Sequence, residues 1–334
     1  FLVPLNSFKK LISAVSVSFL VVGSISCGTS NSTSKTRLSS AGATFPAKIY
    51  TRWFSNLATM GGPKVNYQAI GSGSGRKAFI DETVDFAASD DPMSPKDISK
   101  VKRGLVQIPV IGGAIAFGYN NPSCELKLTQ LQAVHIAIGK IQNWSEVGCQ
   151  SQPIVWVHRS DGSGTTKAFT SSMESFSKEW KLGSGKSVAW PTGIGGRGNA
   201  GVANEIRKNI GSIGYINQSY IKGNIKSAAL QNLYGEFIKP NEKSAAIALN
   251  GIILDKNLAG ANPNPSRKGA YSIATLTWIL AYETGNKSNV QAIRETLKYI
   301  LSDESQSKAA ELGFVPLKGE ILNQARAAIS KISK

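Results

Sequence analysis

The stretch IVWVHRSDGSGTTKAF, residues 154–169, joins a short apolar segment to a helical one through a loop of glycine and hydroxyl residues. Ile154–Val157 is typical of a buried strand, and Gly162–Gly164 forms the loop before the expected helix. The same order returns at Val65–Ile70, where the loop Gly71–Gly75 precedes a second expected helix. Because strand, loop and helix recur, the sequence predicts an α/β protein with mostly parallel sheets.

Length and composition indicate a globular chain with room for two domains. The chain has 334 residues, of which 41% are hydrophobic and 18% charged, so it can bury large cores and is not disordered throughout. Its 38 Lys and Arg against 21 Asp and Glu give a net charge of +17. This excess of cations indicates an anionic partner. The basic residues are scattered without an arginine-rich run or interleaved aromatics, which disfavours nucleic acid.

The first residues have the layout of an export signal. Lys9–Lys10 precedes the apolar segment Leu11–Val22, which is too short to span a bilayer, and small residues lead to Cys27. We therefore expect residues 1–26 to be a signal peptide. Cys27 is a candidate for lipidation, which would anchor the protein to a membrane; the alternative is an ordinary signal peptide that ends near a cysteine. The polar segment 27–36 is expected to be a tether.

The remaining cysteines and the histidines predict no metal centre. Cys124 and Cys149 are expected to form a disulfide in an exported protein, and two separate buried thiols are the alternative. His135 and His158 are the only histidines and do not complete a zinc framework. His158 is interpreted as a strand residue rather than a catalytic base. We expect neither a metal nor a cofactor.

Three segments combine small residues with hydroxyls just ahead of expected helices: Ala41–Pro46, Gly71–Gly75 and Arg159–Thr165. A helix N-terminus offers unpaired N–H groups and a partial positive charge, and glycines let an anion approach the backbone. Any one segment is equally explained as a cap in which Thr44, Ser74 or Ser163 closes its own helix. Three together favour an oxyanion site, for which the Arg159 guanidinium supplies a matching fork.

Enzyme motifs are weak in this chain. The segment Gly71–Lys77 has Arg76 where a nucleotide-binding loop needs its second glycine, and Ala78 follows Lys77. The G-x-S-x-G motif of a nucleophile elbow is absent from the sequence. A phosphatase-like enzyme on the same scaffold is the alternative from another functional class.

The three segments, together with Val65–Gln68, Val84–Asp90 and Gly193–Asn199, make the chain resemble the periplasmic phosphate-binding proteins of bacterial phosphate ABC transporters. The resemblance runs from about Ser40 to Phe314. It implies a two-lobed periplasmic-binding-protein fold with two interlobe crossings, near Ile108–Asn120 and Lys268–Tyr282. The implied lobes are, for lobe one, residues 37–112 and 265–334 and, for lobe two, residues 113–264.

The resemblance also implies a function and a set of site residues. A monomer would bind inorganic phosphate by hinge closure and deliver it to a membrane permease. Asp161 would hold Arg159 in place, and Phe45 would act through its backbone N–H. Ser89 and Gly73 would lie nearby. The implied phosphate-binding residues are Thr44, Phe45, Ser72, Asp90, Arg159, Ser163, Gly164 and Thr165.

Asp90 is the informative member of this set, because a carboxylate that faces an anion must accept a proton from it. Phosphate carries a proton at neutral pH, whereas sulfate is fully ionised and would leave a buried acceptor facing lone pairs. The residues alone favour a different interpretation, in which Asp90 or Asp91 caps the turn before Pro92. Binding of another tetrahedral oxyanion, sulfate or arsenate, is the nearest alternative function.

Overall fold

The computed structural model describes residues 36–334. The predicted signal peptide, Cys27 and residues 27–35 of the predicted tether lie outside this range. No helix within the described residues is long and apolar enough to cross a membrane. The same residues contain no group of three or more His, Cys, Asp or Glu side chains arranged to hold a metal ion.

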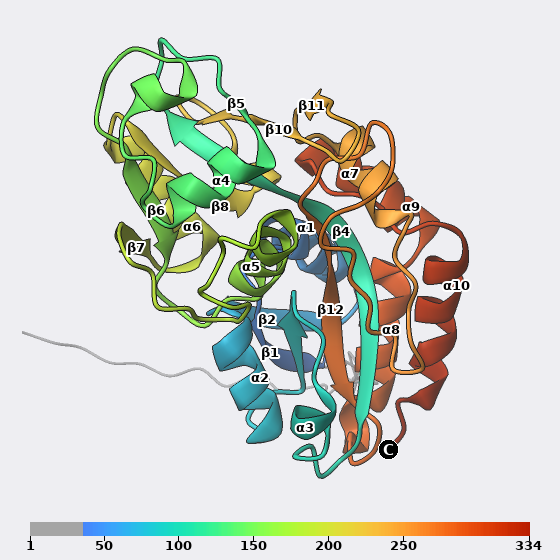
Figure 1. The fold of residues 1–334 in the computed structure, drawn as a ribbon. Helices are drawn as coiled ribbons and strands as arrows, with labels where there is room; N and C mark the ends of the chain where they lie inside the picture. Colours follow the sequence, from blue (N-terminus) through green and yellow to red (C-terminus); the bar gives the residue numbers. More distant parts are fainter. Residues whose placement is uncertain (1–35) are drawn as a thin grey trace, which may run out of the picture. The chain divides into compact units, whose positions relative to one another are not determined.

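A long strand, β4 (Leu105–Asn120), joins two sheets into one nine-stranded array (Figure 1). Residues 105–114 of β4 pair with β12 in what we call the first sheet, and residues 115–120 pair with β8 in the second sheet. The strand order is β2-β1-β3-β12-β4-β8-β6-β7, with β9 also beside β4. The other strands of the array are β1 (Arg37–Gly42), β2 (Lys64–Ala69), β3 (Phe86–Ser89), β6 (Val155–Arg159), β7 (Ile194–Gly196), β8 (Ser212–Asn217), β9 (Lys226–Ser227) and β12 (Ala274–Tyr282).

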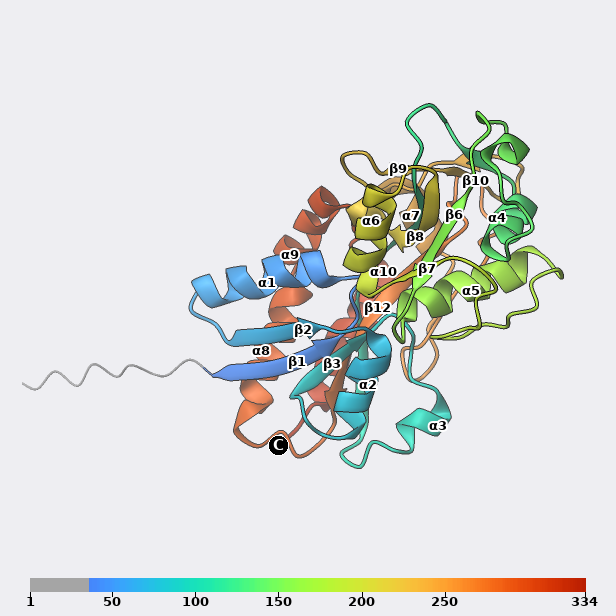
Figure 2. The same ribbon diagram turned by 90° about the vertical axis from the view of Figure 1, so that its left-hand side faces the viewer.

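The strands at the two ends of the array are parallel, whereas the central ones are not. β1 runs parallel to both β2 and β3, which Figure 2 shows side by side, and β6 runs parallel to β7 and β8. β12 is antiparallel to β3 and β4, and β4 is antiparallel to β8. The prediction of mostly parallel sheets is therefore wrong for the centre, because the strand-loop-helix pattern marks only the outer βα units and not the two long apolar strands between them.

The helices follow the predicted pattern with one informative shift. The glycine-rich segment after β2 is not a separate loop, because α2 (Ser72–Ile80) already begins within it. Gly75 lies where a Cβ atom would come against the backbone of Gly42 in β1, so glycine lets this helix pack on the sheet. The other α-helices are α1 (Ala47–Thr59), α3 (Pro95–Ile98), α4 (Gln130–Ala137), α5 (Gly164–Phe176), α6 (Gly198–Lys208), α7 (Glu242–Leu249), α8 (Val290–Ile300), α9 (Asp303–Ser307) and α10 (Gly319–Ala328).

The core follows the two central strands. Every residue of β4 after Leu105 is buried, and so is every residue of β12 after Ala274. Such continuous apolar strands are covered on both faces. On the first sheet, α1 contributes Tyr50 and Trp53 to this core. The burial fixes the strands on which the polar side chains described below are placed.

A small third sheet lies in the segment after β4. It contains β5 (Lys127–Leu128), β10 (Ala229–Gln231) and β11 (Phe237–Ile238). Cys124 and Cys149 flank β5 and α4, and their sulfur atoms are bonded in the structure, with Cα atoms 5.5 Å apart. The Tyr119 hydroxyl donates to the Cys124 carbonyl, 2.8 Å away. The disulfide thus ties the loops at this end of the second sheet.

Candidate functional site

Residues from both sheets meet where several strands end and helices begin. Thr44 lies between β1 and α1, Ser72 is the first residue of α2, and Asp90 follows β3. From the second sheet come Arg159, the last residue of β6, and Thr165 in the first turn of α5. All five side chains are buried, with at most 6% of each residue exposed. The structure therefore brings together residues that lie up to 121 positions apart, from Thr44 to Thr165.

Direct hydrogen bonds connect the two sides of this site. The Thr44 hydroxyl accepts from the backbone N–H and the side-chain amide of Asn199, each at 3.0 Å. Asn199 also donates to the Thr165 hydroxyl at 3.1 Å. At the edge of the site, the Gly73 N–H donates to the Gly162 carbonyl at 2.8 Å. The Thr44–Asn199 and Gly73–Gly162 bonds join the first sheet to the second, so the two sides are in direct contact around the site.

Arg159 is held by Asp161. Its Nε and Nη2 donate to the two carboxylate oxygens at 2.7 and 2.6 Å, a two-pronged ion pair. Asp161 also accepts from the Gly198 N–H at 2.9 Å. Burial by itself would raise the pKa of Asp161, but the hydrogen bonds and charge of Arg159 hold that pKa below its usual value. The remaining Arg159 Nη1 lies 3.4 Å from the Thr165 hydroxyl, within the site. Asp161 thus fixes the orientation of the Arg159 guanidinium.

Asp90 is a buried carboxylate within hydrogen-bond reach of both sheets. Its Oδ1 accepts from the Thr277 hydroxyl at 2.8 Å, and its Oδ2 lies 3.3 Å from the Thr165 hydroxyl. Burial raises the pKa of Asp90 to about 7, against the opposing effects of Thr277, Arg159 and Thr165. A carboxyl with this pKa exchanges a proton near neutral pH.

The alternative in which Asp90 caps a turn is wrong, because its carboxylate faces the site. The cap of α3 comes instead from Ser94, whose hydroxyl accepts from the Asp97 N–H. Asp91 has a different role, since its carboxylate pairs with Arg76 at 2.5 Å. The neighbouring Ser89 hydroxyl donates to the Asp91 carbonyl at 2.6 Å, so it serves this turn.

The beginning of α5 combines a cap with a close approach. The Ser163 hydroxyl accepts from the Thr166 N–H at 3.0 Å, so Ser163 does cap its own helix. A Cβ atom on Gly164 would lie 2.6 Å from the Ser72 hydroxyl and 2.8 Å from the Asp90 Cβ. Only glycine lets this helix end come so near the first sheet. The N-terminal N–H groups of α5 therefore open onto the same site as Asp90.

Phe45 and Thr44 differ from plain caps. Thr44 does not cap α1, whose first turn follows Pro46 without a side-chain hydrogen bond. The Phe45 ring is buried and packs edge-on against Phe314, with centroids 6.1 Å apart. The backbone N–H of Phe45 makes no hydrogen bond with any of residues 36–334. An anion could therefore be bound through this N–H.

Sequence reasoning missed two residues of the site. Asn199 lies in the Gly193–Asn199 segment noted above, but neither its position in the sequence nor its residue type predicted a role in the site. Its Oδ1 accepts from the Asn217 N–H at 2.7 Å, which fixes the orientation of the amide. Thr277 is one of two threonines in the otherwise apolar strand β12, and its sequence neighbourhood carries no signal of a function.

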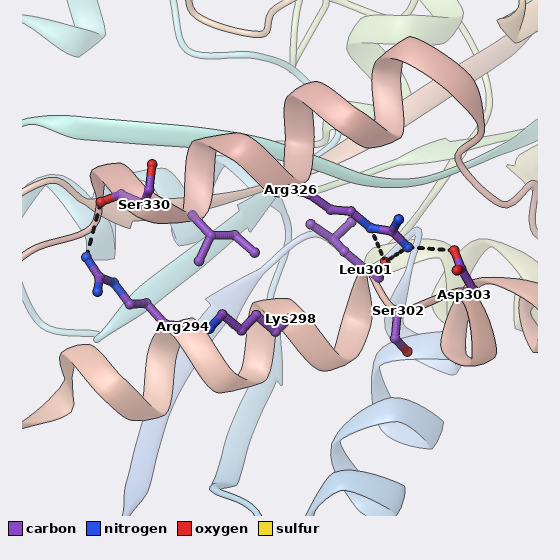
Figure 3. Close-up of a pocket in the computed structure, with 8 residues that line it drawn as sticks. Arg294, Lys298, Leu301, Ser302, Asp303, Arg326 and Ser330 are labelled. Atoms are coloured by element: carbon purple, nitrogen blue, oxygen red, sulfur yellow. Dashed lines mark hydrogen bonds and ion pairs between the residues drawn. The ribbon is translucent and has the colours of Figure 1, made fainter.

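Other candidate features prove to be structural. The His158 ring stacks on Trp190 with centroids 5.3 Å apart, as expected for a strand residue. A surface cavity of about 600 Å³ lies between α8 and α10 (Figure 3). Its Arg294 donates to the Ser330 carbonyl, and its Arg326 donates to the Leu301 carbonyl. Both guanidinium groups therefore bind carbonyls at helix ends.

Comparisons with known proteins point in one direction. Residues 29–304 match a family described as the PBP superfamily domain. The phosphate-binding protein PstS of Pasteurella multocida is 35% identical over 316 residues, which cover 87% of this chain and 89% of that protein. The PstS of Haemophilus influenzae is 36% identical, with 86% and 90% covered. The phosphate-binding protein of Stenotrophomonas maltophilia has the same two-lobed fold, with a TM-score of 0.74 at 20% identity over 87% of this chain and 93% of that one.

Proposed function

Because the chain belongs to the PstS family of phosphate-binding proteins, we propose that it binds inorganic phosphate outside the cytoplasm and delivers it to the permease of a phosphate ABC transporter. The observation that carries the ligand assignment is the buried carboxylate of Asp90 beside the Arg159 guanidinium. A cation and a proton acceptor in one dry site fit an oxyanion that carries both charge and a proton.

Phosphate meets this requirement and sulfate does not. Asp90 can accept the proton of a phosphate hydroxyl, whereas sulfate would place lone pairs against a buried acceptor at a cost of about 1–3 kcal/mol or more. Arsenate shares the protons and shape of phosphate, so Asp90 does not discriminate between these two. The proposed ligands besides Asp90 are Thr44, the Phe45 N–H, Ser72, Arg159, Ser163, Gly164 and Thr165.

Binding is proposed to close a hinge between two lobes. Lobe one is residues 37–112 with 265–334, and lobe two is residues 113–264. This division is supported by β4, which changes its pairing from β12 to β8 between Ala114 and Ile115. An anion between Asp90 and the start of α5 would contact both lobes at once and favour the closed form. The permease would then recognise that form.

The same proposal includes the cellular location, the membrane anchoring and the oligomeric state of the protein. Residues 1–26 would direct export, and acylation of Cys27 would anchor a monomer to the membrane through the tether. Mass spectrometry of the mature N-terminus would detect the lipid. We propose a binding protein and not an enzyme, since His158 is stacked on Trp190 instead of being paired with a nucleophile.

Calorimetric titration with phosphate and sulfate tests the function, after unfolding and refolding to remove carried-over ligand. At a pH above the pKa of Asp90, tight one-to-one binding of phosphate without a sulfate signal is expected. Asp90→Asn should weaken phosphate binding, because an amide cannot take up the proton. Equal binding of both anions would refute the role of Asp90, and turnover of a phosphomonoester that is lost in Arg159→Ala would favour an enzyme instead.

A further inference from the structure

We propose that Thr277 is a positioning residue that keeps Asp90 a proton acceptor, and that it thereby sets how strictly the site rejects fully ionised oxyanions. The inference rests on the proposed function of Asp90. It assigns a selectivity role to a residue of β12, a strand that otherwise contributes to the core.

The geometry places the Thr277 hydroxyl on one particular oxygen of Asp90. Thr277 is fully buried, and its Oγ1 lies 2.8 Å from Asp90 Oδ1. The Ser89 carbonyl is a more distant acceptor at 3.4 Å. The ladder between β12 and β4 shifts register between Thr277 and Trp278. Such irregularities re-aim side chains next to functional sites, and here the aimed side chain is a hydrogen-bond donor.

The two oxygens of Asp90 therefore have different surroundings. Oδ1 is bound to Thr277 of β12, which pairs in the first sheet with β3, the strand that Asp90 directly follows. Oδ2 faces Thr165 at 3.3 Å, at the beginning of α5 where the anion is proposed to bind. A hydroxyl that donates to Oδ1 stabilises the charged carboxylate, and Oδ2, whose contact with Thr165 is the longer one, keeps acceptor capacity for the ligand proton.

Neighbouring charges act on the pKa of Asp90 in opposite directions, so one hydrogen-bond donor can decide the protonation state of the carboxyl. Arg159 from β6 favours the ionised carboxylate, and the adjacent Asp91 opposes it. Tyr50 from α1 and Tyr67 from β2 also face Asp90, but burial raises the pKa of both phenols well above the usual value, so they stay neutral. Burial of Asp90 already brings its pKa to about 7, so loss of the Thr277 donor would leave the carboxyl protonated at neutral pH.

A protonated Asp90 would act as a donor instead of an acceptor. It would then offer a hydrogen to sulfate, which has lone pairs on every oxygen and no proton. The penalty that excludes sulfate would disappear, while Arg159 would still attract the anion. Loss of the Thr277 hydroxyl should therefore relax selectivity instead of simply abolishing binding.

Sulfate titration of the full chain across acidic to mildly alkaline pH tests this role, because sulfate stays fully ionised throughout and every pH effect then comes from the protein. Thr277→Val removes the hydroxyl at nearly constant shape, and Thr277→Ser keeps it as the matched control. In the unsubstituted protein, sulfate binding should strengthen only as the pH falls through the pKa of Asp90. Thr277→Val should move this transition up by about one to two pH units, the value of a hydrogen bond to a charged group. Thr277→Ser should leave it in place.

Several outcomes would overturn the inference. If Thr277→Val folds and shows the unsubstituted protein's sulfate transition, Thr277 does not set the charge of Asp90. Thr277→Ala provides the same test should the valine variant fail to fold. In an Asp90→Asn background, Thr277→Val should cause no further shift, and a shift there would also contradict the proposal. If the unsubstituted protein binds no phosphate, the proposed function fails together with the inference, whereas phosphate binding with an unmoved sulfate transition removes the inference alone.

Discussion

Gly164→Ala should weaken closure of the site without destabilising the fold, because the nearest atoms to the added methyl group belong to Ser72 and Asp90 on the opposite side of the site. Gly164 is the first residue of α5, and it is not among the residues with a positive φ. Alanine therefore suits its backbone. In the closed structure, however, the new Cβ would lie 2.6 Å from the Ser72 hydroxyl and 2.8 Å from both the Cβ and the backbone N of Asp90.

The size of the effect follows from this overlap. A contact under 3.0 Å with backbone atoms must be relieved by movement of α5 away from the first sheet, and overpacking of this kind costs about 1–3 kcal/mol. If the overlap destabilises the closed form alone, phosphate affinity should fall by about 5- to 150-fold. The unliganded protein should keep its stability, because alanine in a helix is favoured over glycine by about 0.5–1 kcal/mol.

Gly162→Ala is the matched variant for this measurement. It lies two residues away on the same side of the site, and its added Cβ would lie 3.2 Å from the Gly73 Cα, a contact that a small shift relieves. Calorimetric titration should therefore rank affinities as unsubstituted protein, Gly162→Ala, then Gly164→Ala. Thermal unfolding without phosphate should show three similar midpoints.

Phosphate affinity in Gly164→Ala equal to that of the unsubstituted protein would refute the reasoning. It would mean that phosphate binding does not need the close approach of α5 to Ser72 and Asp90. A lowered unfolding midpoint in the absence of phosphate would likewise contradict it, since the overlap would then be present in the unliganded protein as well.

Three further predictions concern other contacts. Asn199→Ala should weaken phosphate binding about 5- to 100-fold, because it removes the side-chain amide that donates to the Thr44 and Thr165 hydroxyls. Calorimetry would measure the loss, and unchanged affinity would exclude the Asn199 side chain from closure. Reduction of Cys124–Cys149 should lower the free energy of unfolding by about 3.5 kcal/mol, given a sequence separation of 25, without changing phosphate affinity. Urea denaturation with and without reductant would test this, and an equal midpoint would contradict it. Asp161→Asn should reduce the loss of stability that the protein shows as the pH falls into the acidic range. A carboxyl whose pKa is lowered by folding stabilises the folded protein above its usual pKa of 3.8, and this stabilisation is lost as the pH falls below that value. Thermal unfolding from neutral to acidic pH would show the difference, and identical slopes would rule out the contribution.

The outer βα units could be predicted from the sequence because their signals are local. The strand ending at Arg159, the cap at Ser163 and the following helix all lie within one short stretch, and the structure has them in that order. The two central strands carry no such signal. Their apolar residues show burial, but the direction of β4 and β12 depends on partners more than 150 residues apart, such as Ile108 and Ile279.

The same distinction applies to the site. The segments rich in glycine and hydroxyl residues predict hydrogen-bond donors for an anion from the sequence alone. A role for Asp90 could be predicted only from the resemblance to phosphate-binding proteins. Thr277 could not be found in this way, since its function depends on a register shift in β12 and on the oxygen of Asp90 that it reaches. Asn199 depends in turn on a hydroxyl 155 residues away. Contacts of this range are properties of the folded chain.

Because the Gly73 amide donates to the Gly162 carbonyl, hydrogen exchange at this amide reports on the closed state. The bond is made across the site, so the amide is shielded only while the two sides are together, whereas amides within β4 stay paired in their own ladders. When reclosing outpaces exchange, the deuterium uptake of the Gly73 amide relative to a free peptide gives the fraction of time that the molecule spends open. Phosphate should slow that uptake in proportion to its occupancy, so a single backbone position would report the fraction of molecules that hold the ion.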